Sequence, residues 1–72
     1  MVDDAEYNEM KDRIKEYLAG LETKPVDTTI NIAKALGMKR RDASKILARM
    51  ETDGLVQSAG VTAGVAGYKL LQ

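Results

Sequence analysis

Apolar residues recur along the first part of the chain with the spacing of an amphipathic helix. Between about Asp4 and Leu21, successive apolar positions are separated by 3, 4, 3, 1 and 3 residues, which places them on one helical face. Acidic residues at the start favour the helix dipole, and Gly20 and Pro25 mark the end. The pattern predicts one helix with a buried stripe made by Tyr7, Met10, Ile14, Tyr17, Leu18 and Leu21.

A short second helix is predicted from about Ile30 to Leu36. An extended connector precedes it, in which Val26 is expected to form a minor strand. The hydroxyl of Thr28 or Thr29 can cap the helix by accepting from a free N–H group. Gly37 then closes the helix in a left-handed turn. The residues expected to face inward are Ile32, Ala33 and Leu36.

A third helix is predicted from about Arg40 to Thr52. Lys39 holds the cap position and is a poor cap, which Asp42 in the first turn offsets in part through the helix dipole. Asp53 and Gly54 end the helix. Its buried stripe is expected at Ala43, Ile46, Leu47 and Met50.

The last third of the chain predicts a β-hairpin. Residues 55–58 and 68–71 are read as strands, and residues 59–67 as a glycine-punctuated loop between them. This loop contains no charged residue. We therefore expect it to add little electrostatic affinity for a polyanion, and either to be disordered or to make an apolar contact with a partner through Val61 and Val65.

The predicted order of helix, helix, tight turn, helix and hairpin resembles the winged helix-turn-helix superfamily. The resemblance is carried by Ala33, by the turn at residues 36–37 and by the entry to the hairpin at residues 54–56. It implies a mainly helical fold of three helices with a two- or three-stranded antiparallel wing sheet. One domain is expected to cover residues 1–72, in which about residues 1–6 could be disordered.

Two families within the superfamily are similar. One is the MarR-like set of small transcription regulators. The other is the Z-alpha domain, which binds left-handed Z-DNA with an Asn and a Tyr on the third helix and a Trp in the wing. The matching positions here are Ser44, Ala48 and Tyr68, so the first two depart from the Z-alpha pattern.

Charge is divided between the two halves of a chain whose formal net charge is zero. Residues 1–33 carry eight acidic and four basic groups, a net charge of −4. Residues 34–72 carry seven basic and three acidic groups, a net charge of +4. Within residues 34–49, six basic residues stand against the single acidic residue Asp42. Since salt screens exposed charges beyond about 10 Å, this local cluster matters more than the total. This cluster indicates a polyanion as the partner of the second half.

Candidate contacts to double-stranded DNA follow from docking the third helix in a groove. Arg41 could bond guanine with two hydrogen bonds, and Ser44 could bond a base or a phosphate. The other cations of this helix are read as phosphate contacts. A hydroxyl and free N–H groups at the start of the second helix would also suit phosphate. The full candidate set is Thr29, Lys34, Lys39, Arg40, Arg41, Ser44, Lys45, Arg49, Tyr68 and Lys69.

Composition argues against several other classes. Cysteine and histidine are both absent, so the sequence offers no disulfide, zinc site, thiol chemistry or histidine proton shuttle. No catalytic constellation is recognisable, and we expect neither an enzyme nor a cofactor. A membrane-spanning run and a signal peptide are not visible, and the cysteine-free composition fits a cytoplasmic protein.

Three functions remain open from the sequence. The first is a DNA-binding transcription regulator, for which a domain this small indicates a homodimer. The second is an adaptor that binds a protein and no nucleic acid, through the first helix or the wing; the end of the first helix with Tyr7 and Met10 could pair with a second copy. The third is a binder of Z-form DNA or duplex RNA.

Overall fold

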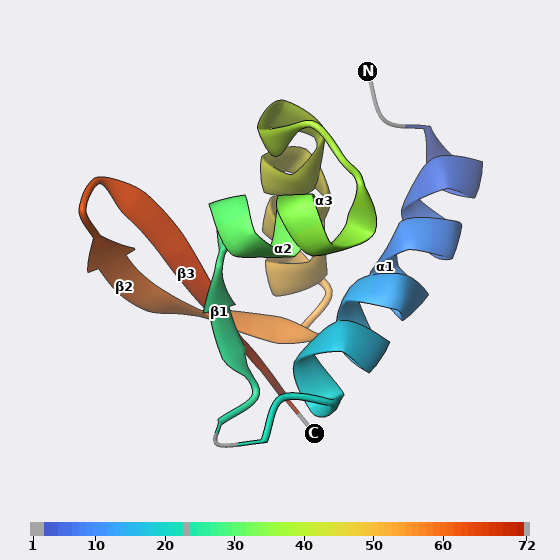
Figure 1. The fold of residues 1–72 in the computed structure, drawn as a ribbon. Coiled ribbons are helices and arrows are strands. Elements are labelled where there is room, and N and C mark those ends of the chain that lie inside the picture. Colours follow the sequence, from blue (N-terminus) through green and yellow to red (C-terminus); the bar gives the residue numbers. More distant parts are fainter. Residues whose placement is uncertain (1–2, 23, 72) are drawn as a thin grey trace.

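The computed structural model describes residues 3–22 and 24–71 and has the winged-helix architecture expected from the sequence (Figure 1). Three helices and three strands follow in the order α1, β1, α2, α3, β2, β3 within these residues. Their bounds are Asp4–Ala19 for α1, Val26–Thr28 for β1, Thr29–Leu36 for α2, Arg40–Thr52 for α3, Val56–Thr62 for β2 and Val65–Leu70 for β3.

Helix α1 begins where an acidic cap can satisfy its first free N–H groups. The Asp3 side chain accepts a hydrogen bond of 2.8 Å from the backbone N–H of Glu6, which is the usual capping geometry. The helix therefore starts at Asp4, within residues 1–6, which the sequence analysis considered as a disordered stretch. Met1 and Val2 of that stretch lie outside the described residues.

Helices α2 and α3 are joined by the left-handed turn expected at Gly37. Its φ is 67°, a value that glycine adopts without strain. The N–H of Met38 donates to the carbonyl of Ala33 at 2.8 Å, and that of Gly37 donates to Lys34 at 3.3 Å. These bonds close the end of α2. At its start, Thr28 is the cap, because its hydroxyl accepts from the N–H of Asn31.

The prediction of a long wing loop over residues 59–67 is wrong. Strands β2 and β3 pair almost to their tip, and a two-residue turn at Ala63 and Gly64 joins them. Both turn residues have positive φ, 52° and 78°, as in the type I′ turn that matches the twist of a hairpin. The register shifts by one residue between Ser58 and Val61, so the hairpin contains a β-bulge.

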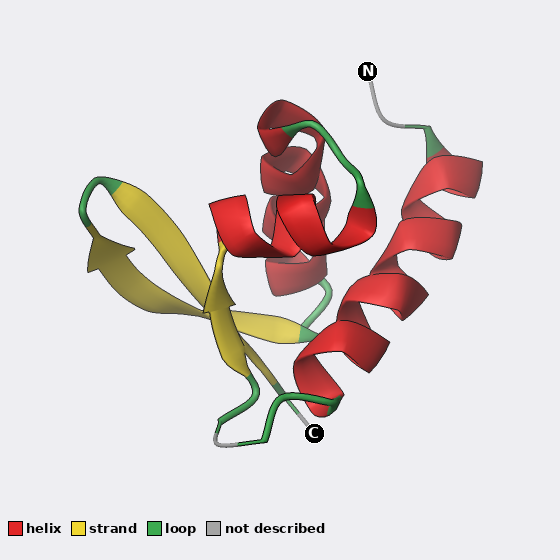
Figure 2. Cartoon of the chain, viewed as in Figure 1, coloured by secondary structure: helices red, strands yellow, loops and turns green. Residues whose placement is uncertain are grey.

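The three strands form an antiparallel sheet in the order β1-β3-β2. The helices lie beside one end of this sheet, and the hairpin of β2 and β3 projects away from α1 (Figure 2). The prediction of a minor strand at Val26 is confirmed by its pairing with Lys69. The buried residues of the core come from all three helices and from β2 and β3: Tyr7, Met10, Ile14, Leu18, Ile32, Ile46, Leu47, Met50, Val56 and Leu70.

The core includes Tyr7 and Met10 of α1, the two residues that were considered as contacts with a second copy of the chain. Tyr7 is 2% exposed and Met10 is 8% exposed within the single chain. Neither side chain is therefore available as an apolar contact for another molecule. The contacts of α1 in this structure are with α2, α3 and β3.

Candidate nucleic-acid interface

The exposed side of α3 presents the residues that the sequence proposed as DNA contacts. Ala43, Ile46, Leu47 and Met50 are buried, as predicted. Residues on the opposite side of a helix recur three and four positions apart. The resulting α3 face consists of Arg41, Ser44, Lys45 and Ala48, and all four are exposed.

The cations around the α3 face are not neutralised by carboxylates. Across residues 3–22 and 24–71, the one side-chain ion pair is that between Arg49 and Asp4. Arg40 and Lys39 are exposed at the start of α3, and the Lys39 side chain makes no cap hydrogen bond. Lys34 is exposed in the last turn of α2. Five exposed cations without an ion pair can therefore meet an anionic ligand. Arg41 and Lys45 belong to the α3 face, Lys39 and Arg40 lie at the start of α3, and Lys34 lies on α2.

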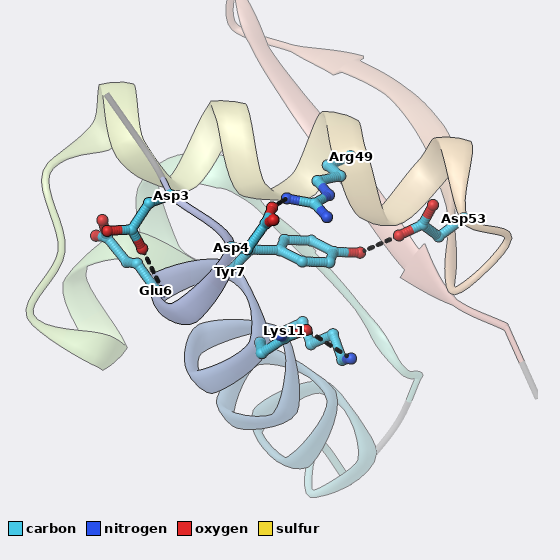
Figure 3. Close-up of polar contacts among 8 residues, drawn as sticks. Asp3, Asp4, Glu6, Tyr7, Lys11, Arg49 and Asp53 are labelled. Carbon is cyan, nitrogen blue, oxygen red and sulfur yellow. Dashed lines mark hydrogen bonds and ion pairs between the residues drawn. The ribbon is translucent and has the colours of Figure 1, made fainter.

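Arg49 differs from these five cations, because it is turned toward α1. Its Nη1 donates to Asp4 Oδ1 at 2.8 Å, and the centre of its guanidinium lies 4.0 Å from the centroid of the Tyr7 ring. Figure 3 shows Arg49 above this ring, with Asp4 and Asp53 at either side. The expectation that Arg49 is free to neutralise a phosphate is therefore not met in this arrangement.

Tyr7 connects the buried core to this polar cluster. Its hydroxyl donates to Asp53 Oδ2 at 2.6 Å, which ties the first turns of α1 to the end of α3. Burial of the ring, the hydrogen bond to Asp53 and the charge of Asp53 raise the pKa of Tyr7 to about 12, against the opposing effect of Arg49. Tyr7 is consequently neutral and a hydrogen-bond donor at physiological pH.

Thr29 does not belong to the exposed surface, which corrects its place among the candidate contacts. It is 2% exposed, and its hydroxyl donates to the carbonyl of Ala66 at 2.8 Å. The side chain therefore fastens α2 to β3 and has no access to a ligand. This hydrogen bond could not be predicted from local sequence, since the two residues are 37 positions apart.

The start of α2 is also closed to phosphate by the chain's own groups. Asp27 accepts from the N–H of Thr28 at 2.8 Å, from the Asn31 amide at 2.9 Å and from the Tyr17 hydroxyl at 2.6 Å. Burial raises the pKa of Asp27, but these three hydrogen bonds together lower it below its ordinary value. The resulting carboxylate would repel an anion at this helix end.

Tyr68 and Lys69 lie on opposite faces of β3, because side chains alternate along a strand. Tyr68 is half-buried and packs against the core, in keeping with the reading of this tyrosine as a strand residue. Lys69 is exposed and lines a groove on the outer face of the sheet with Lys24, Pro25, Val26 and Ala59. Its neighbours Tyr68 and Leu70 point toward the core, so Lys69 points away from the helices and is not part of the α3 face.

The contacts that the sequence analysis missed join residues far apart in the chain. Asp4 and Arg49 are 45 positions apart and Tyr7 and Asp53 are 46 apart. One local signal existed for Arg49. It lies eight positions after Arg41, which turns it about 80° around the helix from that residue. This angle could have placed Arg49 at the edge of the exposed face, although it could not have identified Asp4 as its partner.

The fold and the position of the α3 face define a winged helix-turn-helix domain. No described protein family and no curated protein matches the sequence. A similar solved structure is the crystal structure of the AntR antimony-specific transcriptional repressor. The match has a TM-score of 0.67 and 20% sequence identity, and it covers 100% of this chain and 71% of that chain. At this identity the likeness shows the common fold.

Two other features, a membrane-spanning helix and a metal-binding cluster, are absent from the residues that the structure describes. None of the described helices combines the length and apolarity required to cross a bilayer. Within the same residues, no three Asp or Glu side chains gather in an arrangement that could hold a metal ion.

Proposed function

We propose that this protein is a transcription regulator that binds double-stranded DNA by placing α3 in the major groove. The α3 face carries the proposal: Arg41 and Lys45 lie one turn apart, exposed and without a carboxylate partner. A major groove about 12 Å wide admits one helix. The proposal is also supported by the fold that this chain shares with the AntR antimony-specific transcriptional repressor.

The contacts divide into two kinds under this proposal. Arg41 and Ser44, both on the α3 face, are placed to meet base edges. Lys34, Lys39, Arg40 and Lys45 contact phosphates and fix the position of the helix without reading sequence. With about four phosphates neutralised, log affinity should fall with log salt at a slope of about −3.6.

Fluorescence anisotropy with labelled duplex DNA at several salt concentrations tests the proposal. The wild-type protein should bind with the negative salt slope given above. Lys45→Ala should weaken binding to all sequences and reduce the magnitude of the slope by about 1. Arg41→Ala should weaken binding and also reduce discrimination between sequences, with a cost of about 1–3 kcal/mol at the preferred base.

Lys24→Ala is the matched control for these two substitutions. It removes one positive charge as well, but from the outer face of the sheet, so affinity should change little. If all three variants behave alike, the α3 face is not the binding surface. If the wild-type affinity is independent of salt, the proposed contact with phosphates is wrong.

A second candidate is an adaptor that binds a protein partner through the wing. The observation in its favour is Val61, which is 70% exposed on a hairpin without charged residues from position 56 to position 68. Under this hypothesis, Val61→Ser abolishes capture of the partner, and the wild-type protein gives no anisotropy signal with duplex DNA.

The same anisotropy series with Z-form DNA and duplex RNA distinguishes those ligands from B-form DNA.

A further inference from the structure

Arg49 is held by Asp4 and Tyr7 on the side of α3 that faces α1, with Asp53 close by. Asp4 accepts its hydrogen bond at 2.8 Å, the Tyr7 ring lies beneath its guanidinium at 4.0 Å, and Asp53 is fixed next to that ring by the Tyr7 hydroxyl. The arrangement combines one hydrogen bond between charged groups with a cation–π contact.

The position of this cluster matters because Arg49 borders the α3 face. Arg49 lies one turn after Lys45, so the two side chains are neighbours along the helix surface. A phosphate that contacts Lys45 would therefore be close to Arg49. Asp4 competes for the same guanidinium, and its carboxylate also repels that phosphate.

Both partners remain accessible to solvent. The side chain of Arg49 is 45% exposed and that of Asp4 is 85% exposed. An exposed pair is weak and sensitive to salt, so a single substitution can open it without a change in the core. Tyr7 would stay buried, since its ring packs in the core and its hydroxyl is bonded to Asp53.

We propose that Asp4 is an autoinhibitory residue that withholds Arg49 from nucleic-acid phosphate. The acidic start of α1 thereby limits how many phosphates the domain neutralises. A partner or modification that removes the charge of Asp4, or draws it away, would add one cation to the interface. This inference rests on the proposed function, and it concerns the strength of binding.

Asp4→Asn tests the inference with duplex DNA in the anisotropy assay. The variant should bind about two- to fivefold more tightly at low salt, as expected for one exposed charge contact. Its salt slope should become steeper by about 0.9, because one more phosphate is neutralised. Asp12→Asn is the matched control, since it changes the net charge equally from an exposed position of α1 away from the buried stripe.

A double-mutant cycle assigns the gain to Arg49. In the Arg49→Ala background, Asp4→Asn should no longer increase affinity, because the residue that it releases is absent. The inference is overturned if Asp4→Asn and Asp12→Asn have equal effects, or if the gain persists without Arg49. Thermal unfolding of each variant verifies that the fold is kept.

The same experiment separates the inference from the proposed function. If the wild-type protein binds with the expected salt slope and Asp4→Asn has no effect, the inference alone fails. If the wild-type protein does not bind duplex DNA, both fail.

Discussion

Tyr7 shows how one side chain can serve the core and the polar surface together. Its ring is buried in the main cluster of apolar residues, while its hydroxyl donates to Asp53 and its face receives Arg49. An aromatic residue with a polar tip is suited to this boundary. The stripe of apolar positions predicted the burial, whereas the two polar partners required the folded arrangement of α1 against α3.

Tyr7→Phe should reduce the free energy of unfolding by about 1 kcal/mol at neutral pH, the contribution of one hydrogen bond. The pKa of Tyr7 is raised from its ordinary value of 10.0 to about 12 by folding. The contribution of the neutral Tyr7 hydroxyl to the free energy of unfolding is therefore fully present below pH 10, and it is lost as the pH rises through about 12.

Chemical denaturation between neutral pH and pH 12 checks this prediction. Wild-type stability should fall more steeply above pH 10 than that of Tyr7→Phe, so that the difference between them shrinks. Tyr68→Phe is the control, because it removes a hydroxyl from β3 outside this cluster. Identical pH dependence in the wild-type protein and Tyr7→Phe would show that the Tyr7 hydroxyl makes no such contribution.

Arg41 and Arg49 illustrate what the sequence could and could not predict about the candidate site. Both belong to the same helix, and the sequence treated both as candidate DNA contacts. The buried stripe of α3 is sufficient to place Arg41 on the exposed side. The orientation of Arg49 depends on its hydrogen bond to Asp4, a residue 45 positions away. The burial of Thr29 likewise involves a distant residue, because its hydroxyl donates to the carbonyl of Ala66.

Among the elements, the helices were predicted closely because each carries a period and an end signal. The bounds of α3 agree with the prediction, and its stripe is buried at the expected four positions. The Gly37 turn needed a positive φ, which the residue type signals. The hairpin lacked such signals. Residues 59–67 consist of Gly, Ala, Val and one Thr, so they show little alternation between apolar and polar types.

The tip of the wing offers a test at the scale of this element. Ala63 has a φ of 52°, which is unfavourable for an L residue with a Cβ atom. Asn tolerates this conformation and precedes Gly in the preferred type I′ turn. Ala63→Asn should therefore increase the free energy of unfolding by about 0.5–1 kcal/mol.

Urea denaturation of Ala63→Asn and Ala63→Val checks the turn. The Val variant should lower the midpoint, because a β-branched residue is poorly accommodated at positive φ. The two substitutions should thus act in opposite directions. A shift of both midpoints in the same direction would contradict the turn geometry in the structure.

For the whole molecule, the separation of charge matters more than its sum. Acidic residues predominate on α1, whereas α3 and the residue before it carry Lys39, Arg40, Arg41 and Lys45 without a carboxylate partner. The hairpin projects on the side of the molecule away from α1 (Figure 1) and carries no charge near its tip. A polyanion should therefore be drawn to α3, and away from α1.

Backbone amide chemical shifts measured while duplex DNA is added test this account most directly. We expect the largest changes at residues 39–48, with smaller changes at Lys34, and none on the acidic positions of α1 around Glu9 and Asp12. Changes confined to the wing or to α1, or no change at all, would contradict binding of DNA through the exposed face of α3.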